Sequence, residues 1–305
     1  MCTKTTHIDR TAHEPRDNSL YTLLISGIIP ITPTIRLFHL SPPPCPSPVP
    51  QQPIHFLPGQ WVDLYYPPFP PHQKPGGFTI TSPPSSLPNY IELAIQSAPS
   101  NPPAAYLWKE PPESLLNTPV RVRIGGSFTY PPPPSTAYKK VIFVAGGVGI
   151  NPIMGMLSHI ASLPALEKSK KEVVVLYGMK DSDGVIQAGT TAQALFLDRI
   201  AGLFAGEDGL RGGVELFLTG SGSKGGEAGG TGDQVIQAHG VKLPFTKRRI
   251  VLGDLEEAIG AGKDEAAVYI CGVPSMTDEL VEGLTSPTPK GLGMDKRRVL
   301  CEKWW

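Results

Sequence analysis

The first part of the chain alternates short apolar runs with proline-rich breaks. Each run is about as long as a strand and is rich in β-branched or aromatic residues, and none repeats with a helical period. Prolines crowd the connections, where a missing N–H group costs little. The runs predict strands at Leu20–Ile28, Ile35–Leu40, Gln60–Tyr66, Gly77–Thr81, Tyr90–Gln96 and Val120–Ile124. We therefore expect a small antiparallel β-barrel or sandwich.

From about residue 140 onward, continuous apolar runs alternate with helix-length stretches. The first run, Val141–Ala145, has no polar position, as expected for a strand buried on both faces. Further strands are predicted at Val173–Tyr177, Val214–Thr219, Ala267–Cys271 and Arg298–Cys301, and helices at Pro152–Leu163, Thr190–Leu203, Leu252–Ile259 and Pro274–Leu284. This alternation predicts an α/β domain with a doubly wound parallel sheet.

Proline and glycine divide the chain at one point. Of the 35 prolines, 28 lie between Pro30 and Pro134, and 27 of the 33 glycines lie from Gly146 onward. Most of the charged residues also belong to the second part. We therefore expect two domains, a barrel over residues 1–134 and an α/β domain over residues 135–305.

Charge and cysteine content exclude several classes of protein. Lys and Arg total 27 and so do Asp and Glu, so the chain lacks the basic excess of a broad nucleic-acid-binding surface. The four cysteines are far apart, which argues against an iron–sulfur cluster or a structural zinc site. No apolar run approaches a membrane span, and the first residues are polar. We expect a cytoplasmic or mitochondrial protein without a secretory signal or a transmembrane segment.

The strongest chemical signal follows the first apolar strand of the second domain. The sequence V-I-F-V-A-G-G-V-G-I-N-P, residues 141–152, runs from that strand into three glycines. Glycines allow a tight turn and a close approach of the backbone to a ligand. Asn151 is expected to cap the next helix and Pro152 suits its first turn, so that free N–H groups favour a pyrophosphate. The alternative is a strand–turn–helix corner without a ligand.

The second signal is Y-I-C-G-V-P-S-M, residues 269–276. The predicted strand ends at Cys271, at the carboxyl edge where a parallel sheet places its ligands. Taken alone, a cysteine in this place is also explained as a small core residue.

Together these two motifs resemble the ferredoxin–NADP reductase superfamily, with its G-G-x-G-x-x-P turn and its C-G-x-P-x-M sequence. The first domain extends the resemblance, because P-G-Q-W-V-D-L (residues 58–64) looks like a strand of the flavin-binding barrel. The sequence G-G-F-T (residues 76–79) stands where the flavin motif R-x-Y-[ST] belongs. The ending C-E-K-W-W is similar to the terminal E-x-aromatic of these reductases. More narrowly, the whole set looks like the oxidoreductase NAD-binding domain-containing protein 1 group.

The resemblance implies an NAD(P)H-dependent oxidoreductase. In the superfamily the second domain binds NAD(P)H and the barrel binds a flavin, here FAD rather than FMN. Hydride passes from the nicotinamide to the flavin, and electrons then leave for an acceptor. The chain contains no fused ferredoxin-like cysteine set, so the acceptor is separate and unidentified: a protein, a quinone or oxygen.

The resemblance also assigns roles to residues. Its catalytic candidates are Cys271, Thr79 and Glu302, with Thr79 in the place of the hydroxyl group that contacts the flavin ring. The nicotinamide nucleotide would be held by Gly146, Gly147, Gly149, Ile150, Asn151, Pro152, Tyr177, Gly178, Cys271, Gly272, Pro274 and Met276. The flavin would be held by Gly76, Gly77, Phe78, Thr79, Ile80 and Thr81, with Glu302 and either Trp304 or Trp305 near its ring. Ordinary packing of the C-terminus is an alternative explanation for the tryptophans.

The flavin motif departs from the family pattern in three places. The arginine that neutralises the flavin phosphate is replaced by Gly76, and the tyrosine by Phe78. The second phosphate-binding segment falls near residues 101–104, where Pro102 and Pro103 remove two N–H donors. An unpaired phosphate is costly, so flavin binding is expected to be weaker or to use other groups. Lys74, Arg121 and Arg123 are the substitutes, or else ordinary surface charges.

Three further questions stay open in the sequence. A preference for NADPH needs a basic cluster beside the adenine ribose, for which the candidates are Lys180, Lys224 and the run Lys247–Arg249; the run is also explained as a solvated turn. The proline-rich loop, residues 41–53, is either a stiff solvated loop or a polyproline ligand. A competing hypothesis for the whole chain is a nucleotide-binding or interaction protein that has kept this fold and lost flavin and catalysis. The glycine-rich segment, residues 220–232, is expected to extend a loop on the ligand-facing edge of the sheet.

Overall fold

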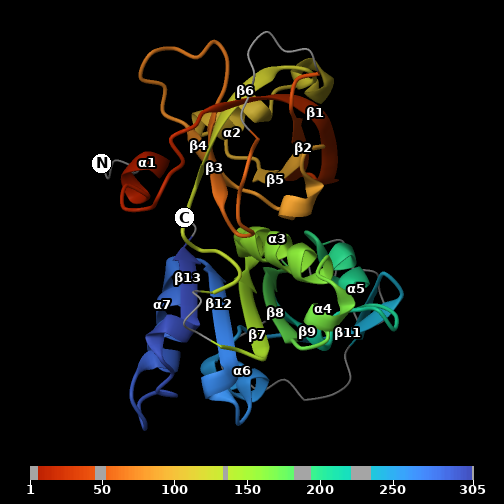
Figure 1. Ribbon diagram of the computed structural model, residues 1–305, viewed down its shortest axis with the longest axis vertical. Coiled ribbons are helices and arrows are strands. Elements are labelled where there is room, and N and C mark those ends of the chain that lie inside the picture. Colours follow the sequence, from red (N-terminus) through yellow and green to blue (C-terminus); the bar gives the residue numbers. More distant parts are fainter. Residues whose placement is uncertain (1–5, 45–52, 133–136, 182–193, 221–234, 304–305) are drawn as a thin grey trace. The chain divides into compact units, whose positions relative to one another are not determined.

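The strands form two sheets, one in each of two units, Met1–Tyr130 and Pro131–Trp305 (Figure 1). The computed structural model describes residues 6–44, 53–132, 137–181, 194–220 and 235–303. Several predicted features lie outside these residues: most of the proline-rich loop and of the glycine-rich segment, Lys224, Trp304 and Trp305. Residues 190–193, the start of one predicted helix, also lie outside them.

The first unit is an antiparallel barrel, as the sequence predicts. Its strands are β1 (Tyr21–Thr32), β2 (Ile35–Ser41), β3 (Trp61–Tyr65), β4 (Gly76–Thr79), β5 (Ile91–Gln96) and β6 (Pro119–Gly125), in the spatial order β4-β3-β6-β1-β2-β5. The two end strands close on each other, because Ile80 bridges Leu93 and the Thr81 N–H donates to Glu92 O at 2.8 Å. All six predicted strands are present within a few residues.

Alternation along the strands fills the barrel. In β3, Val62 and Leu64 belong to the core cluster, and in β1 Tyr21, Leu23 and Ile25 do the same. A period of two places these side chains on one face of each strand. The neighbouring residues of β3, including Asp63, therefore face away from that core.

The first unit also contains short helices that the sequence pattern does not predict. They are α1 (His7–Arg10), α2 (Pro102–Leu107), η1 (Pro84–Ser86) and η2 (Pro112–Leu115). None completes two turns, so no periodic pattern develops. In α1, Thr6 accepts from the Asp9 N–H while the Asp9 carboxylate accepts from the Thr6 N–H, which forms a capping box.

The second unit is a doubly wound sheet, in agreement with the predicted α/β class. Its strands are β7 (Lys140–Gly146), β8 (Glu172–Lys180), β9 (Gly212–Thr219), β10 (Val235–Ala238), β11 (Val241–Thr246), β12 (Ala266–Gly272) and β13 (Val299–Lys303). They lie in the order β10-β11-β9-β8-β7-β12-β13 and are parallel except for the β10–β11 pair. β9 ends at Thr219, at the carboxyl edge of the sheet.

Helices cover both faces of this sheet (Figure 1). They are α3 (Ile150–Ala161), α4 (Ala165–Lys168), α5 (Leu197–Phe204), α6 (Leu252–Ile259) and α7 (Pro274–Thr285), with short η3 (Gly147–Gly149), η4 (Lys263–Glu265) and η5 (Lys296–Arg298). Leu255 and Ile259 of α6 and Leu280 and Leu284 of α7 form one core with alternate residues of β7 and β12. α3 and α5 contact each other over the other face. The bounds of α6 agree with the predicted Leu252–Ile259, whereas α5 begins only at Leu197.

The β10–β11 hairpin is absent from the sequence-based expectation. Its two-residue turn, His239-Gly240, has positive φ at both positions (47° and 72°). The signal is present as two short alternating runs around that turn, but Pro244 within the second run argues against a strand. β11 nevertheless contains Pro244, one strand in from the edge of the sheet.

Candidate functional site

The first part of the site is the turn between β7 and α3. Residues Val141–Ala145 of β7 are completely buried, so the strand fixes where the turn begins. Gly147 has a φ of +55°, and a Cβ atom built there meets no atom within 4 Å. The left-handed backbone favours glycine, and the space in front of it is open. Such a turn leads the backbone N–H groups toward a ligand at the start of a helix.

The second part is the turn between β12 and α7, which packs against the first. A Cβ atom on Gly149 would lie 2.1 Å from the carbonyl oxygen of Cys271. One on Gly272 would lie 2.5 Å from Met276 Cε and 3.3 Å from Gly146 Cα. Gly149 is therefore required by the close approach of two backbones, whereas Gly272 is favoured by a tight contact with the Met276 side chain and a closer-than-usual approach to Gly146. The structure brings together the two motifs that the sequence singles out, at the carboxyl edge of adjacent parallel strands.

The start of α3 differs from the expectation. The helix begins at Ile150 with Gly149 in the N-cap position, and Asn151 lies inside the first turn, so the prediction that Asn151 caps the helix is wrong. A glycine replaces the polar cap because the chain passes from the η3 turn straight into the helix. Pro152 lies in the first turn as predicted, where no N–H partner is needed.

Two of the catalytic candidates lie in adjacent strands. Cys271 at the end of β12 pairs in register with Glu302 of β13, and both lie beside the glycine turns. Cys271 is fully buried, as a small core residue would be. Lys303 follows Glu302 and forms an ion pair with Asp278 of α7 at 2.5 Å, which ties β13 to that helix. Pro274 occupies the first turn of α7.

Of the residues expected near the adenosine end of the nucleotide, one is buried in the sheet, one is exposed at its edge and one is paired with a carboxylate. Tyr177 is buried in β8 and its hydroxyl donates to Leu195 O at 3.3 Å; burial raises the pKa of this phenol well above its ordinary value. Gly178 pairs in register with Gly146. Lys180 ends β8 at the carboxyl edge and is exposed. Arg248 instead forms a bidentate pair with Asp254, at 2.7 and 2.6 Å.

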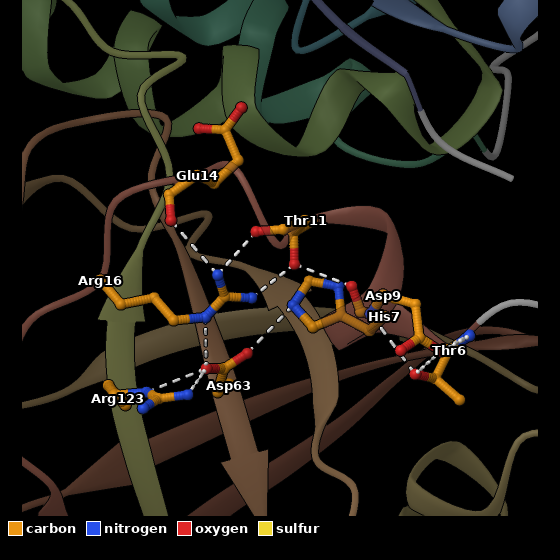
Figure 2. A network of polar contacts seen from close by, with 8 residues as sticks. All are labelled: Thr6, His7, Asp9, Thr11, Glu14, Arg16, Asp63 and Arg123. Carbon is orange, nitrogen blue, oxygen red and sulfur yellow. Dashed lines mark hydrogen bonds and ion pairs between the residues drawn. The ribbon is translucent and has the colours of Figure 1, made fainter.

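In the barrel, the outward face of β3 and β4 is covered by the N-terminal segment (Figure 2). Asp63 of β3 is fully buried and receives Arg16 Nε at 3.0 Å and Arg123 Nη2 at 2.6 Å, while His7 Nε2 lies 3.1 Å from its other oxygen. Burial alone would raise the pKa of Asp63, but the hydrogen bonds of His7, Arg123 and Arg16 and the positive charge of Arg16 outweigh it and hold the pKa below its ordinary value. The His7 ring also packs edge-on against Trp61.

This cluster fixes His7 directly over strand β4. A Cβ atom on Gly77 would lie 2.1 Å from Cε1 of His7. His7 and Arg16 carry no motif in the sequence, and Asp63 is present there only as part of the barrel strand P-G-Q-W-V-D-L. The one available signal is the lone aspartate in the apolar strand W-V-D-L-Y, since a buried carboxylate requires partners.

The opposite side of β4 is covered by α2. A Cβ atom on Gly76 would lie 2.6 Å from both the Phe78 ring and Pro103 Cβ. Phe78 packs against the barrel core. Pro102 and Pro103 form the first turn of α2 after the Asn101 cap. The N–H donors are missing there, as the sequence analysis expects, but the prolines start a helix and do not interrupt a loop.

The remaining flavin candidates support the barrel wall. Thr79 is buried beside Trp61 in the β3–β4 ladder, and Ile80 belongs to the core. The Thr81 hydroxyl donates to the Glu92 carboxylate at 2.8 Å, at the place where the barrel closes.

Within the described residues, no group of three or more His, Cys, Asp or Glu side chains is arranged to hold a metal ion. No helix among them is long and apolar enough to cross a membrane.

Comparisons with solved structures show the fold. No family model matches the chain. The structure resembles the FAD/NAD-binding domain of a nitric oxide dioxygenase from Vibrio cholerae (TM-score 0.62, 16% identity, 93% of this chain and 98% of that one). It also resembles a ferredoxin–NADP⁺ reductase from Neisseria gonorrhoeae solved with FAD and NADP (TM-score 0.58, 15% identity, 94% and 99%).

Comparisons with curated sequences show the family. Oxidoreductase NAD-binding domain-containing protein 1 of Homo sapiens is 30% identical over 305 residues, which are 99% of this chain and 85% of the relative. The Danio rerio protein of the same name is 30% identical over 305 residues, 99% of this chain and 98% of that protein. Similarity at this level extends over both units and both glycine turns. The chain therefore belongs to the oxidoreductase NAD-binding domain-containing protein 1 family.

Proposed function

We propose that this protein is an NAD(P)H-dependent oxidoreductase of the ferredoxin reductase type, which delivers hydride from the nicotinamide to a flavin and electrons to an acceptor not yet identified. The observation that carries the proposal is the pair of glycine turns at the carboxyl edge of β7 and β12. Gly147 leaves open space there, and Gly149 presses against Cys271. The names of the curated relatives and the bound cofactors of the solved structure from Neisseria gonorrhoeae support the same general activity.

The residues of the turns fit a dinucleotide. The N–H groups of Gly147 and Gly149 and the start of α3 would hold the pyrophosphate, because no side chain stands in front of Gly147. Cys271 and Gly272 would lie along the nicotinamide, with Glu302 beside them in the next strand. When bound, NAD(P)H supplies two electrons and a proton as hydride. The protein's part is to position the donor.

The choice between NADH and NADPH rests on Lys180. Arg248 bonds Asp254, whose carboxylate also accepts from the Val251 N–H at the start of α6. Arg248 therefore stabilises that helix. Lys180 lies at the carboxyl edge of β8, and it would face a 2′-phosphate if NADPH is the donor.

Titration of the full chain with NADH and NADPH tests the dinucleotide site. In Gly147→Asn the new side chain enters the open space, and asparagine tolerates the left-handed backbone, so we expect weaker nucleotide binding with little change in melting temperature. Gly240→Asn is the matched control, since Gly240 also has positive φ (72°) and open space but lies in the β10–β11 turn. Equal nucleotide affinity in the two variants contradicts the proposal.

Dye reduction tests the redox activity. Full-length protein with NAD(P)H and added flavin should reduce an artificial electron acceptor. We place this activity in the cytoplasm or the mitochondrion and leave the natural acceptor as a protein, a quinone or oxygen.

The second candidate function is a nucleotide-binding or interaction protein that has lost flavin. It is favoured by one observation, the packing of Pro103 and Phe78 against Gly76, where the family pattern has a phosphate-binding arginine. It predicts NAD(P)H binding without dye reduction even when flavin is added.

A further inference from the structure

We infer that the described residues of the barrel form no binding site for a flavin pyrophosphate, so that the protein distinguishes poorly between riboflavin, FMN and FAD. The inference deepens the proposed function, on which it rests for the presence of a flavin.

Strand β4 has no room for a longer side chain at position 76. A Cβ atom at position 76 would lie 2.6 Å from Pro103 Cβ and 2.6 Å from the Phe78 ring, and Pro103 is buried. An arginine side chain cannot start from such a position without displacing both neighbours. Gly77 is closed in the same way by the His7 ring. The chain's own residues therefore cover both sides of this strand.

The start of α2 offers few N–H donors. A pyrophosphate taken out of water needs several N–H groups or cations to replace its hydration. Pro102 and Pro103 occupy the first two positions of α2, and neither has an N–H group. The Ala105 N–H already donates to Asn101 O at 2.8 Å.

The cations near β4 already make contacts with other groups of the barrel. Arg123 and Arg16 neutralise buried Asp63. The Arg121 guanidinium lies 4.5 Å from the centre of the Phe69 ring. Lys74 lies close enough to Asp9 to help lower the pKa of that carboxyl, after the two hydrogen bonds from Thr6. Arg123 is therefore engaged by Asp63, whereas Arg121 and Lys74 are exposed and make only weak contacts, so these two cations are tested directly below.

Binding of three flavins to the full-length protein tests the inference. We expect the dissociation constants of riboflavin, FMN and FAD to agree within about threefold. FAD or FMN binding that is tighter than riboflavin by about tenfold or more overturns it. If none of the three flavins binds at about 100 μM, the result agrees with the absence of a pyrophosphate site and contradicts the flavin step of the proposed function. The two ideas thus fail on different results, and NADH binding measured on the same sample shows that the protein is folded.

Variants test the cations separately. Arg121→Ala and Lys74→Ala should leave FAD affinity unchanged within about twofold, and affinity should vary little with salt. Riboflavin is the control ligand, since it has no phosphate. A loss of FAD affinity of about fivefold or more, without loss for riboflavin, assigns the cation to the phosphate and overturns the inference.

Discussion

Replacing Gly149 with alanine tests the close contact on which the proposed dinucleotide site depends. The new Cβ atom would lie 2.1 Å from Cys271 O, 2.6 Å from Cys271 C and 2.9 Å from Gly272 N. All three are backbone atoms, so no side-chain rotation relieves the contact. The β7–α3 turn and the end of β12 must separate by about 1 Å to restore ordinary contact distances.

The cost follows from the packing on both sides. An extra carbon in a close-packed interior costs about 1–3 kcal/mol, and rigid backbone on both sides favours the upper end. For a unit of this size, about 3 kcal/mol lowers the melting temperature by roughly 6–12 °C. Because the separation also moves the N–H groups of the turn, NADH affinity should fall by about tenfold or more.

Calorimetry and NADH titration measure both effects. Gly213→Ala is the matched control, because its Cβ atom meets nothing within 4 Å and its backbone is not left-handed. The reasoning is refuted if Gly149→Ala melts within about 1 °C of the unmodified protein and binds NADH equally well.

Three further changes test the rest of the structure. Asp63→Asn should lower the free energy of unfolding by about 3–5 kcal/mol, because it leaves two arginines without a buried partner, whereas Asp295→Asn, at a half-buried carboxylate paired with exposed Arg297, should change it much less. The pKa of Asp63 is lowered on folding, so its contribution is present above about pH 4 and is lost as pH falls; urea unfolding of Asp63→Asn and the unmodified protein should converge in acid. Arg248→Ala should cost about 1–3 kcal/mol, because buried Asp254 loses a half-exposed bidentate partner, and should leave the ratio of NADH to NADPH affinity unchanged, which titration checks. Lys180→Ala should weaken NADPH by about three- to tenfold without affecting NADH, and an equal effect on both would rule out a contact with the 2′-phosphate.

Most patterns longer than about two turns or four strand residues could be predicted from the sequence; the exception is six-residue β11, which contains Pro244. Every predicted strand is present because apolar residues must alternate, or be continuous, where a sheet is covered on one face or on both. The four-residue α1 and six-residue α2 are too short to repeat a period. The start of α3 is missed by two residues because the glycine turn runs into the helix without a polar cap.

The meeting of the two glycine turns could be predicted, because the strands that lead into them are neighbours in the sheet. The carboxyl ends of β7 and β12 meet in adjacent strands, so the sequence signals at Gly146–Gly149 and Cys271–Gly272 necessarily converge. Nothing in the local sequence shows that the carbonyl of Cys271 is what makes Gly149 necessary. Such a requirement depends on contacts between residues more than one hundred positions apart.

The flavin motif shows that the identity of a residue does not by itself reveal which contacts require that residue. Gly76 and Gly77 are adjacent and chemically identical, yet one is required by Pro103 and Phe78 and the other by His7. His7 is in turn held by Asp63, whose charge also engages Arg123, a residue that the sequence offered to a phosphate. The lost arginine could therefore not be restored by a single reverse substitution. An arginine at position 76 would require α2 to move. That change lies within the barrel, so its effect on flavin binding can be measured separately from the proposed dinucleotide site in the other unit.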